Sequence, residues 1–187
     1  MIQWREQPAE LPLHPIDSLY SRLPLAQAKL VEARQSDGLV IVVDAAARIE
    51  VEQHLGASHD EQGGLLVGDV FAGATGAIVA VFVRTGVPAT EFSSSGVSLR
   101  METEVWTRAR EALRERELII GWYHSHPGLG AFFSHTDRRT QRAFFPHPFS
   151  IGWVRDSIYA QECWFAGAES DAVPAERTIT LNPGRAA

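Results

Sequence analysis

Apolar residues recur along this chain with two different periods, which separate its candidate helices from its candidate strands. Met101, Val105, Ala109, Ala112 and Leu113 follow helical spacing with Arg and Glu between them, which predicts an amphipathic helix of about four turns. Apolar runs bounded by glycine or polar residues predict strands instead. The strands expected on this basis are Leu39 to Val43, Gly63 to Phe71, Ala77 to Arg84, Leu118 to Tyr123, Ser150 to Asp156 and Gln161 to Gly167.

Three further helices are expected, at Leu25 to Arg34, at Ala45 to Leu55 and from Ser134 to about Phe145. Helices and strands mix without strict alternation, so the pattern predicts an α+β fold with a mixed, curved sheet. Two segments have no clear period. The first 24 residues hold four prolines and are expected to form an irregular arm that lies on the domain or is partly mobile. The polar stretch Thr85 to Ser98 is expected to be a loop or a weak hairpin.

Length and composition fit one compact domain. At 187 residues and 45% hydrophobic, the chain can bury a substantial core. We expect residues 1–36 to form an N-terminal arm with a short helix, residues 37–182 to form the domain that carries the function, and residues 183–187 to form a tail.

Charge and cysteine content exclude several classes of protein. Seventeen basic against 23 acidic residues give a net charge of −6, whereas nucleic-acid and membrane-surface binders need a positive face. Cys163 is the only cysteine, so neither an intramolecular disulfide nor a cysteine-rich zinc module can form. No apolar stretch approaches the roughly 20 residues of a membrane span, and the first residues lack the layout of a secretory signal, so we expect a cytoplasmic protein.

Candidate chemistry begins where the strand Leu118 to Tyr123 ends. His124 and His126 are two residues apart, so in a strand they project to the same side and can offer two imidazoles to one ion. For a histidine pair with no further support, two partly exposed histidines at a strand end would be the better interpretation. The choice between a metal site and two partly exposed histidines therefore depends on the residues that follow.

Ser134 and Asp137 form the pattern Ser-x-x-Asp, which ahead of a helix is typical of a capping box. That interpretation is compatible with a metal site, because an acid in the first helical turn is held rigidly and can still face an ion. Gly128 and Gly130 in the connection allow the helix start to fold back over the strand end. Two histidines and one carboxylate leave a fourth position open, which is the layout of a catalytic zinc site.

A catalytic zinc site also needs a base that takes a proton from water. The candidate is Glu61, which directly precedes the strand that begins at Gly63. An ordinary surface acid is the alternative, and spacing alone does not exclude it.

The blocks EQGGLLVG (Glu61 to Gly68) and GWYHSHPGLGAFFSHTD (Gly121 to Asp137) together resemble the JAMM, or MPN-plus, metalloprotease family. The family pattern is a glutamate before a Gly-Leu-rich strand, then His-Ser/Thr-His-Pro, six residues and Ser-x-x-Asp. This chain matches every one of those positions, and the resemblance covers roughly Leu39 to Gly167. The segment around the histidines is similar to the deubiquitinating subunits of the proteasome lid and the signalosome.

The resemblance implies a single MPN/JAB domain, cytidine-deaminase-like, with one Zn²⁺ per chain. It implies that His124, His126 and Asp137 ligate the zinc and that Glu61 is the general base. Ser134 would hydrogen-bond the oxyanion of the reaction.

The activity that the resemblance implies is removal or maturation of a ubiquitin-like protein whose C-terminal tail contains glycine. The arginine bias and the short chain indicate a prokaryotic enzyme, and so a bacterial ubiquitin-like conjugation system with activating and conjugating enzymes, some of which act in antiphage defence. Two alternatives stay open: a peptidase that removes a C-terminal amino acid from a sulfur-carrier protein, and a scaffold module without catalysis. Relatives with a His-Asn-His-Pro motif fit less well, because residue 125 is serine.

Other chemically capable residues receive plainer interpretations. We expect His135 to face solvent or to support the ligands from behind. Cys163 is expected to be a small buried thiol. The basic residues Arg138, Arg139 and Arg142 are expected to form a solvated helix face.

Overall fold

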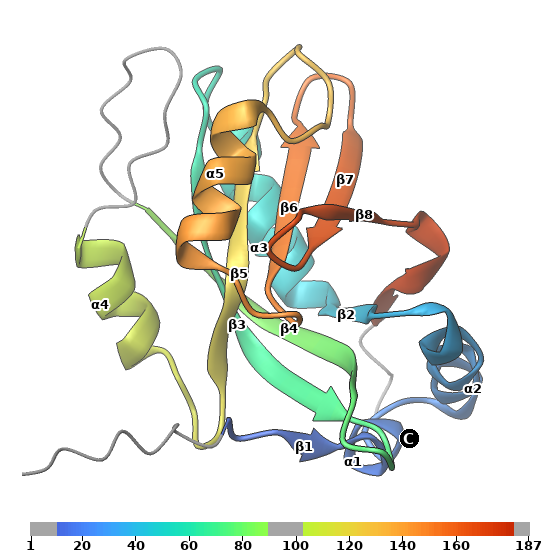
Figure 1. Ribbon diagram of the computed structural model, residues 1–187. Coiled ribbons are helices and arrows are strands. Elements are labelled where there is room, and N and C mark those ends of the chain that lie inside the picture. Colours follow the sequence, from blue (N-terminus) through green and yellow to red (C-terminus); the bar gives the residue numbers. More distant parts are fainter. Residues whose placement is uncertain (1–10, 90–102, 182–187) are drawn as a thin grey trace, which may run out of the picture.

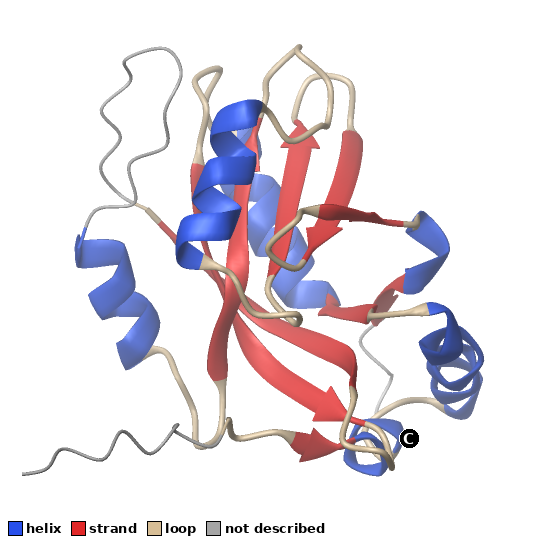
Figure 2. Ribbon diagram, viewed as in Figure 1, coloured by secondary structure: helices blue, strands red, loops and turns tan. Residues whose placement is uncertain are grey.

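A computed structural model of the protein describes residues 11–89 and 103–181, and within them one mixed sheet has helices on both of its faces (Figures 1 and 2). The strands are β1 (His14–Pro15), β2 (Val40–Asp44), β3 (Gly63–Ala72), β4 (Ile78–Pro88), β5 (Leu118–Ser125), β6 (Ile151–Asp156), β7 (Gln161–Ala166), β8 (Asp171–Val173) and β9 (Thr178–Leu181). The helices are α1 (Ile16–Tyr20), α2 (Leu25–Arg34), α3 (Ala45–Gly56), α4 (Thr103–Glu111) and α5 (His135–Phe144), with short 3₁₀ turns at η1 (Gln35–Asp37) and η2 (Ala175–Arg177).

The strands lie in the order β8-β7-β6-β5-β3-β4-β2-β9, and β1 pairs with β3. The pairs β2–β4, β2–β9, β5–β6 and β1–β3 are parallel and the remaining pairs are antiparallel. The expected α+β fold with a mixed sheet is thereby confirmed. Strands β3 and β5 are central in this order, so the segments that carry the candidate chemistry lie side by side.

The alternation of side chains along β3 and β5 divides the core between two faces of the sheet. Leu66 and Tyr123 pack with residues of α3 on one face, whereas Leu65 and Trp122 pack with residues of α4 on the other. Helix α5 lies in front of β5 in Figure 1, and α3 lies behind the sheet. His124 has the same parity as Trp122 and therefore belongs to the α4 and α5 face.

Glycine at position 121 allows β5 and β6 to approach closely. A Cβ atom there would lie only 1.9 Å from the carbonyl oxygen of Ile151, a distance that no side chain can accept. The parallel register that follows places Trp122 opposite Gly152 and His124 opposite Val154. The strand that leads to the histidines is therefore positioned by a glycine three residues before the first of them.

His14 to Tyr20 form β1 and α1, so the expectation of an irregular arm is wrong for this part of the described chain. Leu19 of α1 is fully buried against Val40, Phe71 and other residues of the sheet. Its apolar burial explains why a proline-rich segment is fixed. As expected, the segment lies on the domain.

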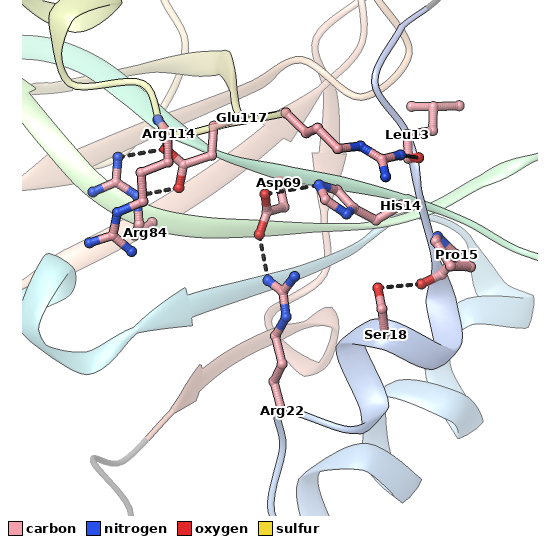
Figure 3. A network of polar contacts seen from close by, with 10 residues as sticks. Leu13, His14, Pro15, Ser18, Arg22, Asp69, Arg84, Arg114 and Glu117 are labelled. Carbon is pink, nitrogen blue, oxygen red and sulfur yellow. Dashed lines mark hydrogen bonds and ion pairs between the residues drawn. The ribbon is translucent and has the colours of Figure 1, made fainter.

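A polar network fixes the same segment to β3 (Figure 3). The buried carboxylate of Asp69 accepts a hydrogen bond from Arg22 at 2.6 Å and lies 3.2 Å from Nε2 of His14. Arg116 donates to the carbonyl oxygen of Leu13 at 2.7 Å. These contacts join the start of the described chain to β3 and to the connection that precedes β5.

Strand β4 extends through Pro88, so of the two expected alternatives, a loop or a weak hairpin, the loop is wrong for Thr85 to Pro88. Gly64 pairs with Pro88 and Leu66 with Gly86. Pairing with β3 therefore extends β4 into residues whose own propensity for strand structure is weak. Residues 90–98 of the expected loop lie outside the described residues, as do Met101 and the expected tail at 183–187.

Helices α2, α3, α4 and α5 agree with the pattern of the sequence, whereas the short helix α1 and three short strands do not follow from it. Helix α3 begins after Asp44, whose side chain accepts hydrogen bonds from the N–H groups of Ala46 and Ala47. Strands β1, β8 and β9 were not expected, and β9 pairs with β2 at the edge of the sheet. Among the described residues, no helix is both long enough and apolar enough to cross a membrane.

Candidate metal centre

Two histidines at the end of β5 and one aspartate at the start of α5 converge on a single point. Nε2 of His124 lies 3.1 Å from Nε2 of His126. The two carboxylate oxygens of Asp137 each lie 3.5 Å from one of these nitrogens. All three side chains are buried, with exposed fractions of 1%, 5% and 7% in chain order.

These distances fit a tetrahedral zinc ion. Ligand atoms about 2.0–2.1 Å from a tetrahedral zinc lie about 3.3 Å from one another, and the observed separations lie within a few tenths of an ångström of that value. A buried pair of imidazole nitrogens aimed at a carboxylate is also a donor set of the kind zinc prefers. The residues present therefore fit the ion that the sequence motif implies.

Charge distribution in the centre favours the metal-binding forms of the ligands. Burial would raise the pKa of the Asp137 carboxyl, but the neighbouring His124 and hydrogen bonds from Ser134 outweigh it and lower the pKa to about 2. Burial lowers the pKa of His126, and His124 beside it acts in the same direction. A carboxylate and a neutral imidazole are the species that bind a metal ion.

The Trp122 side chain holds His124 from behind. The two rings are stacked, with centroids 4.6 Å apart and an interplanar angle of 7°. The indole N–H donates to Oε1 of Gln141 at 2.7 Å, and Nε2 of the same glutamine donates to three backbone carbonyl groups. Because Gln141 is fully buried, its hydrogen bonds fix the indole and with it the plane of the imidazole.

Ser134 and Asp137 form the expected capping box at the start of α5. The N–H of Asp137 donates to Oγ of Ser134, and the N–H of Ser134 donates to Oδ2 of Asp137. The helix therefore holds the carboxylate rigidly while both of its oxygens still face the histidines. The capping interpretation and the metal interpretation apply to the same two residues.

Glu61 is brought to the centre by its neighbour in the chain. The N–H of Gln62 donates to Oγ of Ser125 at 2.9 Å, and the N–H of Ser125 donates to the carbonyl oxygen of Gln62 at 2.8 Å. Oε1 of Glu61 then lies 4.0 Å from Nε2 of His126. Burial, which is the largest contribution, raises the pKa of the Glu61 carboxyl above its ordinary value.

Sequence reasoning named the five residues that the structure brings together here but not those that hold them. Ser125, Trp122 and Gln141 were not singled out. For Ser125 a signal was available, because its position between two histidines places it at the same strand end. Nothing in the sequence connects Gln141 to the histidines, since the contact depends on the packing of α5.

The remaining chemically capable residues lie outside this centre. His135 is exposed, as expected. Cys163 is partly buried, and burial raises the pKa of its thiol, which opposes a role as a nucleophile. Arg138 and Arg142 are exposed and contact Glu169 at the surface.

Comparison with known proteins assigns the chain to a family. Residues 43–165 match the family model described as prokaryotic homologs of the JAB domain. This range is more than half of the chain, so the chain belongs to that family, and the resemblance inferred from the two motif blocks is confirmed.

Two curated relatives show how far this similarity extends. The ubiquitin carboxyl-terminal hydrolase RPN11 of Saccharomyces cerevisiae is 33% identical over 85 residues, which is 43% of this chain and 26% of that protein. The NAD(+) hydrolase TcpA of a Theionarchaea archaeon is 37% identical over 86 residues, which is 46% of this chain and 24% of that protein. The chain thus spans between about a quarter and a third of the first relatives it matches.

A solved structure supports the fold. The solution structure of a protein from Desulfitobacterium hafniense superimposes with a TM-score of 0.57 at 19% identity, over 76% of this chain and 93% of that one. The likeness concerns the fold alone.

Proposed function

We propose that the protein is a zinc-dependent isopeptidase or peptidase that cleaves after the C-terminal tail of a ubiquitin-like protein. The observation that carries the proposal is the convergence of His124, His126 and Asp137, with the carboxylate of Glu61 4.0 Å from His126. Three protein ligands and a nearby base are the components that metal-assisted hydrolysis of an amide requires.

His124, His126 and Asp137 would hold the ion, and Glu61 and Ser134 would act on the reacting groups. Zinc bound there would supply Lewis acidity, which lowers the pKa of water and polarises a carbonyl group. Glu61 accepts the proton of the attacking water and delivers it to the leaving amine, and its raised pKa suits both halves of that transfer. Oγ of Ser134 accepts a hydrogen bond from the Asp137 N–H, so its own proton is available to the oxyanion.

The name of the yeast relative supports ubiquitin-like proteins as the substrate class. We place the enzyme in a cytoplasmic, bacterial ubiquitin-like conjugation system, of the kind that acts in antiphage defence, with activating and conjugating enzymes as its partners. A tail that contains glycine would pass closest to the buried histidines, because glycine has no side chain to clash with them.

Cleavage of a tail extension tests the proposal. The substrate is a ubiquitin-like protein with a Gly-Gly tail that is extended by a short peptide or joined through its terminus to a lysine. We expect cleavage by the zinc-loaded protein, loss of cleavage after treatment with a chelator, and recovery on addition of Zn²⁺ but not Mg²⁺.

Matched histidine variants complete the test. His126→Ala is expected to abolish both zinc binding and cleavage. His135→Ala, which changes an exposed histidine nine residues further along, is expected to leave both unchanged. Cleavage by His126→Ala at the wild-type rate would exclude this metal centre as the catalytic one.

A further inference from the structure

Asp156 is a buried carboxylate that accepts hydrogen bonds from four backbone N–H groups. It is the last residue of β6 and has an exposed fraction of 0%. Oδ1 accepts hydrogen bonds from the N–H groups of Gly128, Ile158 and Tyr159 at 3.0, 2.9 and 3.1 Å, and Oδ2 accepts one from Gly130 at 2.8 Å. A carboxylate oxygen offers about two lone-pair sites, so Oδ1 is fully used by backbone N–H groups, whereas Oδ2 accepts one such bond.

These four donors come from two different turns. Gly128 and Gly130 lie between the ligand His126 and the helix cap Ser134, whereas Ile158 and Tyr159 lie in the turn from β6 to β7. The two turns lie side by side at one end of the molecule (Figure 1). Asp156 therefore joins the connection between β5 and α5, which links the candidate metal ligands, to the turn between β6 and β7, which contributes no ligand.

The conformation of the first turn depends on this carboxylate. Gly128 and Gly130 have φ angles of 75° and 89°, in the left-handed region that favours glycine. Their N–H groups both point inward to Asp156. Without that acceptor both N–H groups would lose this partner, which favours a different course of the turn.

Strand β6 supports the ligand itself through its backbone. The N–H of His126 donates to the carbonyl oxygen of Arg155 at 2.9 Å. The N–H of Leu129 donates back to the carbonyl oxygen of His126 at 3.2 Å. Residues 155 and 156 together thus fix the chain on both sides of the point where the second histidine leaves the strand.

We propose that Asp156 is the positioning residue of the metal centre: it fixes the course of the chain from His126 to Ser134 and thereby sets the separation between the histidines and Asp137. The inference rests on the same metal site as the proposed function but not on the reaction. Asp156 is not one of the three side chains that converge on the metal position, which are His124, His126 and Asp137. It acts as the outer support that metal ligands commonly require.

A buried carboxylate at the other end of β5 provides a matched control. Glu117 has an exposed fraction of 7% and accepts hydrogen bonds from the side chain of Arg84 and the N–H of Arg114. It immediately precedes the strand that ends at the histidines. A variant of Glu117 therefore destabilises the same strand without touching the turn at the metal centre.

The experiment compares Asp156→Asn with Glu117→Gln in the full chain, with no substrate present. Zinc affinity is measured by competition with a chelating dye, and ligand geometry by the visible absorption of the Co²⁺-loaded protein. We expect Asp156→Asn to bind zinc about 10- to 100-fold more weakly and to change the Co²⁺ spectrum. Glu117→Gln is expected to keep the wild-type affinity and spectrum, although it also unfolds more easily. Wild-type affinity and spectrum in Asp156→Asn would overturn the proposal.

A measurement on the wild-type protein keeps the proposal testable if Asp156→Asn does not fold. The amides of Gly128 and Gly130 are expected to exchange with solvent as slowly as those of the neighbouring strands, although they belong to a turn. Rapid exchange of both amides would show that the turn is not fixed and would overturn the inference. Because neither readout uses cleavage, a protein that binds zinc as expected but cleaves no tail would contradict only the proposed function.

Discussion

Ser134 and Asp137 hydrogen-bond to each other twice, and the same carboxylate faces both histidines. The N–H of Ser134 donates to Oδ2 of Asp137 at 2.7 Å, and the N–H of Asp137 donates to Oγ of Ser134 at 3.2 Å. Oδ1 and Oδ2 of Asp137 lie 3.5 Å from Nε2 of His124 and of His126 respectively. The start of α5 and the metal centre are therefore one structural unit, and a change in one affects the other.

Replacing Ser134 separates its two roles. Ser134→Ala removes the acceptor for the Asp137 N–H and should cost about 1 kcal/mol of unfolding free energy. It also removes the proposed oxyanion donor, so kcat should fall about 10²- to 10³-fold while zinc content is retained. Ser134→Thr, which keeps the hydroxyl, is expected to restore most of both. Equal kcat for Ser134→Ala and wild type in zinc-loaded protein would contradict the oxyanion role.

Replacing Asp137 tests the ligand set. Asp137→Asn removes the anionic ligand but keeps the size of the side chain, so zinc should be lost from the purified protein while the fold is retained. Elemental analysis after dialysis measures the loss, and circular dichroism checks the fold. Glu169→Gln, which removes an exposed carboxylate near the same helix, is the control and should retain one zinc per chain. Full zinc occupancy in an Asp137→Asn/His126→Ala double variant would exclude this site.

Replacing Glu61 tests the general base. Glu61→Gln should keep the metal, because the three ligands are untouched, and should lower kcat at least about 10²-fold. Metal content and steady-state kinetics on the tail substrate are measured together. Asp60→Asn changes an exposed acid one residue earlier and should behave as wild type. A Glu61→Gln protein with undiminished kcat would mean that another group moves the proton.

Ser125 should affect catalysis through the placement of Glu61. Ser125→Ala removes the acceptor for the Gln62 N–H, so the segment before β3 can shift while His124 and His126 remain on β5. A misplaced catalytic group can cost up to about 10²-fold, and we expect kcat to fall at least tenfold with zinc affinity unchanged. Ser125→Thr retains the hydroxyl and should recover activity. Loss of zinc rather than of kcat would show that Ser125 supports the ligands instead.

The pH dependence of stability should reveal Glu117. Burial alone would raise the pKa of its carboxyl, but hydrogen bonds from Arg84 and from the Arg114 N–H outweigh burial and lower it. A lowered pKa stabilises the fold above the ordinary value of about 4.3, and this contribution is lost as pH falls through the folded-state pKa. The free energies of unfolding of wild type and Glu117→Gln in urea should therefore differ most near neutral pH, by about 1–3 kcal/mol, and this difference should disappear as pH falls below the ordinary carboxyl pKa. Glu115→Gln changes an exposed neighbour, so its free energy of unfolding should follow that of the wild type at every pH.

The convergence of His124, His126 and Asp137 could be predicted from the sequence because local rules place these three side chains. Alternation along a strand places His124 and His126 on one side, and the capping-box spacing places Asp137 in the first turn of a helix. The proximity of Glu61 to these residues required the family pattern, because the pairing of Gly63 with His124 in β3 and β5 joins segments about 60 residues apart.

The parts that could not be predicted depend on tertiary contacts. Thr85 to Pro88 contains a glycine and a proline, and it is a strand only because β3 provides a partner for it. Asp156 ends an apolar strand and resembles a turn residue in the sequence, and only the fold brings the Gly128 and Gly130 amides to it. The helix at Ile16 is short, and burial of Leu19 under the sheet stabilises it more than its own propensity does.

The stacking of Trp122 on His124 has an optical consequence. The indole of Trp122 is stacked on the imidazole of His124, so a change in charge at that imidazole alters the surroundings of the indole. The fluorescence emission of Trp122 should therefore change when an ion occupies the centre, and Co²⁺ should quench it strongly. Trp153 and Trp164 stack on each other in the cluster on the α3 face, and they should contribute a steady background. Binding of metal could thus be followed in the unlabelled protein by fluorescence, with Trp122→Phe as the silent reference.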